Sequence, residues 1–250
     1  MSEQKAMAVF FEIHSGNAQE GPGDFESTRR AFAMRGSLPK APEILDAGCG
    51  PGRQTLDLLR LTDGTITAVD NHGPFLEHLQ RRAAEAGLAR RVTTLQADMA
   101  DLPFEDGTFD VIWGEGSIYN IGFDEGLKKW RRLLKPDGAV AVSELTELRP
   151  CAPEEAVAFW KGAYPVMRDI EGNVAAFGEA GYRPVGHFIL PESAWWDYYK
   201  PILKKLRGLR QQYGNDPEAL RIVENERIEM DFYRKYSAYY GYVFYLARKI

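Results

Sequence analysis

The sequence predicts an α/β fold built on a doubly wound parallel sheet. Two observations lead to this prediction. Strand-like and helix-like segments alternate from Ile44 to Ser143, as expected for a parallel sheet with helices on both faces. A glycine-rich turn also joins the first predicted strand to the first predicted helix, which is where such sheets bind nucleoside ligands.

The first strand and its turn carry the strongest signal. The strand ends near Asp46 and runs into three glycines at alternate positions, Gly48, Gly50 and Gly52, before a predicted helix over 53–61. Because glycine has no Cβ, the backbone can turn sharply there and a ligand can approach it closely. The turn is therefore the predicted floor of a binding site.

The second strand, 65–70, ends in the carboxylate of Asp70, which suits hydrogen bonds to ribose hydroxyls. The helix expected over 74–86 begins with proline and stops at Gly87, in line with the positional preferences of these residues. The turn and the carboxylate together predict a cofactor that contains a nucleoside.

Three more strands complete this region, over 91–95, 109–114 and 139–143. A helix over 124–134 is expected before the last of them, with Lys135-Pro136-Asp137-Gly138 as the turn that ends it.

The glycine spacing excludes two common nucleotide-binding loops. A nicotinamide or flavin fingerprint needs G-x-G-x-x-G, but counting from Gly48 or Gly50 places Arg53 or Thr55 at the third glycine. A Walker phosphate loop needs Gly-Lys-Ser/Thr, and Gly52 is followed by arginine.

The spacing Asp-x-Gly-x-Gly-x-Gly over 46–52 resembles motif I of the class I S-adenosylmethionine (SAM) methyltransferases. Other segments match that family in register: 96–104 its acidic loop at the adenine, 109–114 the strand that ends at the active site, and 133–138 the turn before strand five. The resemblance spans residues 40–148. It implies a seven-stranded Rossmann-like sheet with an antiparallel last strand, SAM as cofactor, and methyl transfer to a small molecule.

The resemblance also implies which residues bind the cofactor. The three glycines would form the floor under SAM, and Asp70 would hold the ribose with Asn71 beside it. Asp98 would accept from the adenine amino group, and the Met99 backbone would lie against the ring. Asp46 suits the positive charges of such a ligand. The full set is Asp46, Gly48, Gly50, Gly52, Gln54, Thr55, Asp70, Asn71, Asp98, Met99 and Glu115.

The candidate catalytic residues are Glu115, directly after strand four, and Tyr119 in the loop that follows. Doubly wound sheets bind ligands beyond the carboxyl ends of their strands, so Glu115 is expected to contact the acceptor or the methionine part of SAM. The alternative is a solvated loop carboxylate or a cap. Glu144 is a second candidate carboxylate, because it follows strand five directly, as Glu115 follows strand four.

Two segments lie outside this core. Residues 1–40 are predicted to form an N-terminal cap or lid, because the loop over 19–23 is rich in glycine and proline and could close over a cofactor. A simple cap helix over 25–35 is the alternative. Residues 41–250 are expected to form the methyltransferase domain.

In the C-terminal part, a helix is expected over 171–180 and strands over 181–190 and 239–248. Two long helical patterns, about 193–236, would then be inserted inside the last hairpin of the sheet. We expect them to cover the acceptor side of the site or to form a subunit contact, which leaves a homodimer open.

A closer resemblance covers nearly the whole chain. The segments 113–123 and 188–196 are similar to those of a bacterial methyltransferase subgroup of unassigned substrate, distantly akin to the ubiquinone/menaquinone C-methyltransferases. This likeness supports the fold and the cofactor, but it names no acceptor. A SAM-binding module that regulates or scaffolds a partner without catalysis is the alternative function.

Composition narrows the choice further. Hydrophobic residues make up 44% and charged residues 27% of the chain, and the net charge is −5, which argues against broad nucleic-acid binding. No apolar run is long enough for a membrane span. The two cysteines suggest a reducing cytoplasm, and four scattered histidines predict no metal site.

Overall fold

The computed structural model describes residues 3–250. Their sheet has the order β3-β2-β1-β4-β5-β8-β7, with a short strand, β6, paired to β5 outside this path. The bounds are Glu43–Ala47 for β1, Thr65–Asp70 for β2, Val92–Gln96 for β3, Phe109–Glu115 for β4, Leu134–Glu147 for β5, Arg168–Asp169 for β6, Tyr182–Ile189 for β7 and Tyr240–Lys249 for β8. Only β8 runs antiparallel to its neighbours within this described sheet.

This topology confirms the predicted seven-stranded, doubly wound sheet with its antiparallel strand. The strands β1 and β4 are nearly fully buried, as is typical of central strands in a parallel sheet. The additional strand β6 was not predicted, because two residues without an apolar pattern give no strand signal.

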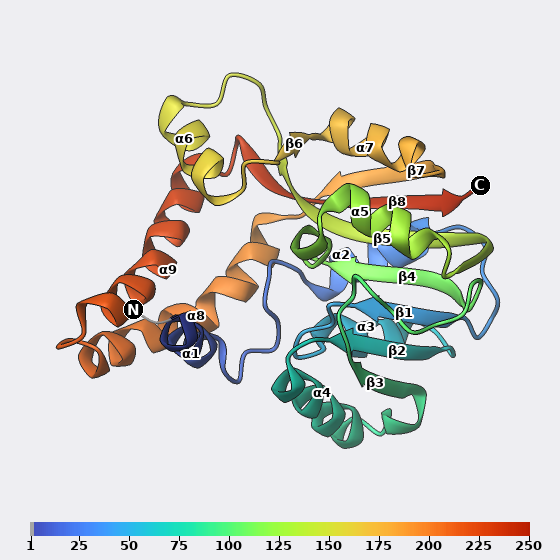
Figure 1. The fold of residues 1–250 in the computed structure, drawn as a ribbon, viewed down its shortest axis with the longest axis horizontal. Helices are drawn as coiled ribbons and strands as arrows, with labels where there is room; N and C mark the ends of the chain where they lie inside the picture. Colours follow the sequence, from blue (N-terminus) through green and yellow to red (C-terminus); the bar gives the residue numbers. More distant parts are fainter. Residues whose placement is uncertain (1–2) are drawn as a thin grey trace.

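Helices cover both faces of the sheet and one of its ends (Figure 1). Their bounds are Glu3–His14 for α1, Phe25–Met34 for α2, Arg53–Leu61 for α3, Gly73–Glu85 for α4, Phe123–Arg131 for α5, Glu154–Ala163 for α6, Ile170–Glu179 for α7, Glu192–Gln212 for α8 and Pro217–Tyr236 for α9. Two 3-10 turns, η1 at Ala89–Arg91 and η2 at Ile118–Ile121, complete the described elements.

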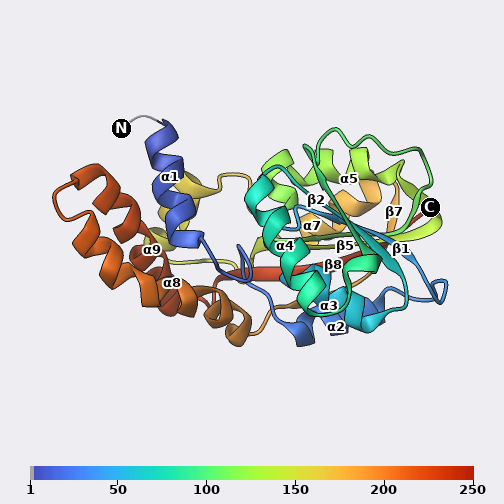
Figure 2. The same ribbon diagram turned by 90° about the horizontal axis from the view of Figure 1, so that it is seen from below.

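Two apolar layers hold the sheet. Residues of α2, α3 and α4 pack on one face, and residues of α5 and α7 pack on the other. Figure 2 shows α5 and α7 on one side of the sheet and α2 and α3 on the other. Trp113 of β4 and Trp130 of α5, both almost fully buried, are the largest side chains of the two layers.

A third apolar cluster joins α1, α6, α8 and α9, which we call the helical cap. In Figure 1 these helices lie on the left, at the end of the sheet from which β8 points away. Since β8 is antiparallel to β5, the cap lies at the carboxyl ends of the parallel strands. The helices α8 and α9 connect β7 to β8, as predicted. Asp216 caps α9 by accepting from the Ala219 amide at 3.2 Å, and Pro217 occupies its first position.

The prediction for strand five was wrong at its start. Residues 135–138, expected as a turn, lie inside one continuous strand, because Leu134 pairs with Phe109 and Ala139 then pairs with Val111 after a register shift. Asp137 makes the local kink with a φ of 58°. The predicted helix before it ends earlier, at Arg131. Neither α1 nor α6 was predicted.

Candidate active site

A cavity of about 620 Å³ opens at the carboxyl ends of β1, β2 and β4, within the range typical of small-molecule sites, roughly 300–1,000 Å³. Its floor is the turn between β1 and α3, and its opposite wall is formed by α1 and the loop that follows α1. Two regions far apart in the sequence therefore enclose it.

Backbone hydrogen bonds fold the glycine turn against β2. The amides of Gly48 and Cys49 both donate to the Val69 carbonyl, at 2.8 and 2.9 Å, and the Gln54 side chain donates to the Cys49 carbonyl at 3.0 Å. Gly48 has a φ of 74°, and a Cβ there would lie 2.4 Å from the Cβ of Ser117. Only glycine fits this close approach.

Asp70 holds the turn from the other side. One of its carboxylate oxygens accepts from the Gly50 amide at 2.9 Å, and the other accepts from the His72 amide at 2.9 Å. The carboxylate therefore fixes the shape of the cavity floor as well as facing the cavity.

The acidic loop after β3 forms the next part of the wall. Asp98 accepts from the Ala100 amide at 2.8 Å, an arrangement that turns the loop back on itself. The Met99 carbonyl accepts from the indole nitrogen of Trp130 at 2.9 Å, so this backbone position is anchored to the core.

The structure brings most of the predicted site residues together around this cavity. Those that line it are Gly48, Gly50, Gln54, Asp70, Asn71, Asp98, Met99, Glu115 and Tyr119.

Three other predicted residues lie beneath the floor and do not line the cavity. Asp46 is fully buried and accepts from the Thr55 hydroxyl at 2.6 Å. Burial raises the pKa of Asp46 to about 7, with the charge of Glu115 adding to the shift and the hydrogen bonds from Thr55 and Gln54 opposing it. Gly52 starts α3 with a φ of 84°, where a Cβ would lie 2.3 Å from Leu79. These residues support the turn.

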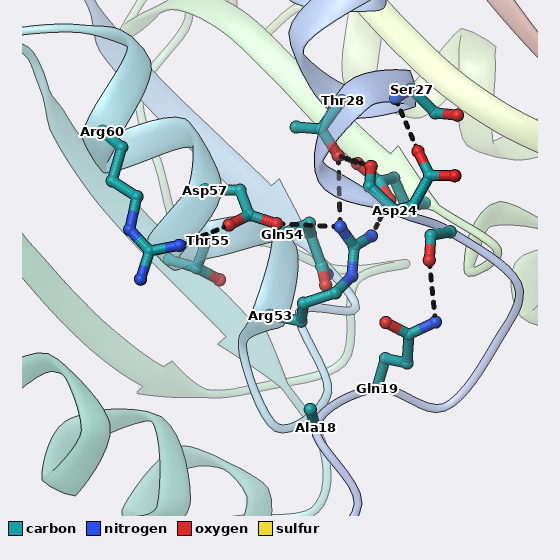
Figure 3. A network of polar contacts seen from close by, with 12 residues as sticks. Ala18, Gln19, Asp24, Ser27, Thr28, Arg53, Gln54, Thr55, Asp57 and Arg60 are labelled. Atoms are coloured by element: carbon teal, nitrogen blue, oxygen red, sulfur yellow. Dashed lines mark hydrogen bonds and ion pairs between the residues drawn. The ribbon is translucent and has the colours of Figure 1, made fainter. Parts of the chain in front are cut away.

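Glu115 lines the cavity, but its carboxylate is already saturated. It forms a short ion pair with Arg53, and it accepts from the Thr28 hydroxyl at 2.8 Å and the Trp113 indole at 2.9 Å. Figure 3 shows the Arg53 guanidinium between Thr28 and Asp57. The guanidinium donates to the Asp57 carboxylate at 2.9 Å. The side chain of Glu115 is only 4% exposed. This network ties α2 and α3 to the end of β4.

Tyr119 lies in η2 at the mouth of the cavity and is 42% exposed. Its ring contacts that of Tyr164 at 6.1 Å between centroids. Tyr164 also lines a neighbouring cavity of about 250 Å³ together with Glu144. Glu144 is 1% exposed, and burial raises its pKa to about 7, so it does not face the main cavity as a free carboxylate.

Sequence reasoning missed the individual residues of the N-terminal wall. Phe10 and Phe11 of α1 line the cavity, as do Glu20 and Pro22 of the following loop. Phe11 stacks on His72 at 3.9 Å between ring centroids, a contact between segments that no local pattern reveals. The glycine and proline of the loop were the one available signal.

Comparisons with known proteins agree with this geometry. A family described as "Methyltransferase domain" matches residues 44–138. The chain is 27% identical to the 27-O-demethylrifamycin SV methyltransferase of Amycolatopsis mediterranei, over 95% of this chain and 89% of that protein. It is 33% identical to the ubiquinone/menaquinone biosynthesis C-methyltransferase UbiE of Geotalea daltonii, over 48% of this chain and 53% of that protein.

The chain carries a methyltransferase domain, and these similarities support a class I SAM-dependent methyltransferase. Its fold resembles that of a SAM-dependent methyltransferase from Geobacter sulfurreducens solved with S-adenosylhomocysteine (SAH), with a TM-score of 0.81 and 20% identity over 97% of this chain and 98% of that one. These relatives support methyl transfer over the non-catalytic alternative. The likeness to the quinone enzymes expected from the sequence is also confirmed.

The cavity of this methyltransferase fits SAM by the chemistry of its lining. Glu20, Asp70 and Asp98 are among the residues that line it, and an acidic lining suits a ligand that carries an ammonium and a sulfonium. A Cβ on Gly50 would meet only the Glu20 side chain within 4 Å, so this glycine faces open space. Within residues 3–250 no group of three His, Cys, Asp or Glu side chains is arranged to hold a metal, and no helix is both long and apolar enough to cross a membrane.

Proposed function

We propose that SAM binds along the glycine turn and that its methyl group passes to a small-molecule acceptor at the carboxyl ends of β4 and β5. The observation that carries this proposal is the single cavity enclosed by Gly48, Gly50, Asp70 and Asp98. SAM supplies an activated methyl group. The protein's work is then to position the acceptor and exclude water.

In this proposal Tyr119 contacts the acceptor and Glu115 positions the site. Tyr119 is an exposed side chain that lines the cavity. Glu115 is paired with Arg53 and also accepts from Thr28 and Trp113, so its oxygens already have partners within the protein. The network around it instead keeps α2 and α3 fixed beside the end of β4.

Several observations support a small acceptor and a cytoplasmic setting. A relative that aligns with 95% of this chain is named for a rifamycin derivative. The helical cap lies over the carboxyl ends of the strands (Figure 1), and the cavity of about 620 Å³ has a volume typical of small-molecule sites. Neither Cys49 nor Cys151 is in a disulfide.

Calorimetry with SAM and SAH, followed by a product assay over a panel of small acceptors with labelled SAM, tests the proposal. We expect the wild type to bind both ligands, and Tyr119→Ala to bind SAM normally with reduced turnover. Tyr119→Phe keeps the ring and removes the hydroxyl, so its turnover shows which of the two groups the reaction needs. A folded wild type that binds neither ligand would overturn the proposed cofactor site.

A further inference from the structure

A tyrosine of β8 lies beside the end of β4 at the cavity. Gly116 follows β4 directly and lines the cavity, and a Cβ built on it would lie 3.6 Å from the ring of Tyr242. The Tyr242 side chain is half-buried, and its hydroxyl has no hydrogen-bond partner among the described residues. Tyr242 therefore presents a ring and an unpaired hydroxyl at the carboxyl end of β4, where the proposed function places the acceptor.

Two more tyrosines approach this region from other elements. Tyr119 of η2 lines the cavity and is 42% exposed. Tyr198 of α8 is half-buried, and its ring centroid lies 6.2 Å from that of His14 at the end of α1. The Tyr198 hydroxyl also lacks a partner among the described residues. Aromatic side chains of η2, α8 and β8 thus remain partly open where the helical cap meets the sheet.

One carboxylate of the helical cap acts on all three tyrosines. Glu229 of α9 accepts from the Tyr199 hydroxyl at 2.8 Å through one oxygen. Its charge contributes to the raised pKa values of Tyr119, Tyr198 and Tyr242, in each case after the larger effect of burial. Because such electrostatic effects decrease with distance, the three tyrosines surround a shared carboxylate.

The charge of Glu229 is not neutralised within the described part of the chain. No lysine or arginine pairs with it there, and its second oxygen is neither hydrogen-bonded nor fully buried. Burial raises the pKa of Glu229, with the charge of Glu226 adding to the shift and the Tyr199 hydroxyl and His14 opposing it. His14 is itself paired with Glu20 and Glu226. A partly buried carboxylate without its own cation is costly, and a ligand cation would compensate it.

Glu144 of β5 adds a second carboxylate. It is 1% exposed, and neither of its oxygens has a hydrogen-bond donor at normal geometry among the described residues. Its charge also contributes to the raised pKa values of Tyr119 and Tyr242. The cation that acts on Glu144 is Arg168, but this guanidinium donates to both oxygens of Asp124 at 2.7 Å. The tyrosines therefore lie between two carboxylates that lack a cation of their own.

We propose that Tyr119, Tyr198 and Tyr242, together with Glu229, bind a protonated amine of the methyl acceptor. This site rests on the proposed function, since the acceptor must bind beside SAM to fill it. Aromatic rings attract cations over their faces, and the carboxylate gains the cation that it lacks. A neutral alcohol offers neither effect. The ammonium is the group that holds the acceptor here, whichever of its atoms receives the methyl group.

Calorimetry on the SAH-saturated wild type with phenethylamine and phenethyl alcohol tests the proposal. The two probes share a skeleton and differ in the amine, which is protonated at neutral pH. Attraction to the carboxylate and the rings should make the amine bind about tenfold more tightly or better. Equal affinities, tighter binding of the alcohol, or no binding of either probe would overturn the inference and leave the cofactor site standing. A wild type that does not bind SAH would overturn the proposed function itself.

Three variants locate the effect. Glu229→Gln keeps an oxygen for the Tyr199 hydroxyl and should lower the preference for the amine about tenfold, with SAH affinity unchanged. Asp231→Asn is the matched control, because Asp231 lies on the same helix, is 48% exposed and pairs with Arg227 and Arg234; it should leave the preference unchanged. Tyr242→Phe keeps the ring and should retain most of the preference.

An unchanged preference for the amine in a folded Glu229→Gln that still binds SAH would show that the amine is held elsewhere, which overturns the inference. A product assay with labelled SAM and matched pairs of amines and alcohols provides a readout that needs no variant to fold. We expect methylated product from the amines in excess of that from the alcohols. Product from the alcohols alone would also overturn the inference, while leaving methyl transfer from SAM established.

Discussion

The cofactor half of this methyltransferase, β1 to β5 with their helices, and the helical cap are built by different kinds of contact. In the cofactor half, consecutive elements of the chain determine the geometry: the glycine turn after β1 folds on Val69 and Asp70 at the end of the next strand, β2. In the cap, large aromatic side chains from distant segments hold the helices. Trp195 stacks on Tyr233 at 4.1 Å between centroids, and Phe159 stacks on Phe232 at 4.1 Å.

The cavity depends on both regions, since α1 belongs to the cap and also lines the cavity. Cofactor binding is therefore not confined to the half that carries the motifs. The predictions below test how far the two regions are independent.

The largest expected effect comes from the cap. Trp195 is 3% exposed, and replacing a buried tryptophan with alanine typically costs about 3–5 kcal/mol. We expect Trp195→Ala to destabilise the protein by this order in urea unfolding and to weaken SAM, because α1 would lose its support. Trp196→Ala is the comparison: this side chain is half-buried at the edge of the same cluster and carries the Arg234 guanidinium over its ring at 4.7 Å, so its removal should cost less than that of Trp195. Unchanged SAM affinity in a destabilised Trp195→Ala would show that SAM binding does not depend on the packing of the helical cap.

Next in size is a comparison of two glycines in the turn. Gly52→Ala should cost about 2–4 kcal/mol of stability, because its Cβ collides with Leu79 and the backbone is left-handed. Gly50→Ala should cost about 1–2 kcal/mol, since its φ is 53° but its nearest neighbour is 3.6 Å away. The new methyl group of Gly50→Ala enters the cavity. Relative to the stability that each variant loses, Gly50→Ala should therefore lose more SAM affinity than Gly52→Ala. Thermal unfolding and calorimetry on both variants check the contrast.

Asp70→Ala tests the cofactor half alone. Its carboxylate accepts from two loop amides, and charge-assisted hydrogen bonds of this kind are worth about 1.5–3 kcal/mol. SAM should bind about tenfold more weakly or worse, while Asp70→Asn, which keeps one acceptor oxygen, should lie between. Wild-type affinity in a folded Asp70→Ala would show that the turn keeps its shape without this residue.

The smallest expected effect is a pH dependence that joins the two regions. His14 faces Glu20 from the loop, Glu226 from α9 and the Tyr198 ring of α8. Its pKa is raised from 6.5 to about 9, so its contribution to stability is fully present below pH 6.5 and is lost as the pH rises through about 9.

Urea unfolding of the wild type and His14→Gln at both ends of this pH range measures that contribution. The wild type should lose about 1–2 kcal/mol more than His14→Gln on going to high pH. Parallel losses in the two proteins would mean that other groups account for the pH dependence.

The contrast between local and distant contacts also explains what the sequence could predict. The helix α3 was predicted with the bounds it has, and the glycine turn and Asp70 were placed together, because each is specified by neighbouring residues. The saturation of Glu115 could not be foreseen, since it needs Thr28 and Arg53 from separate segments. Likewise, the sequence spacing placed Asp46 beside the turn, but it could not predict that Asp46 is fully buried beneath the turn. The apolar run of α1 does not by itself distinguish a helix from a strand.

The position of β8 has a consequence for the order in which the molecule can assemble during synthesis. This strand lies between β5 and β7 and pairs with both, yet it follows α9 in the chain. The strands β1 to β5, with the cofactor turn among them, can pair as they leave the ribosome. Within the described sheet, β7 pairs with β8 alone. It therefore joins the sheet only after the two inserted helices and β8 have been synthesised. A nascent chain arrested before residue 240 would thus expose the edge of β5 over residues 139–147, and such unpaired edges invite aggregation.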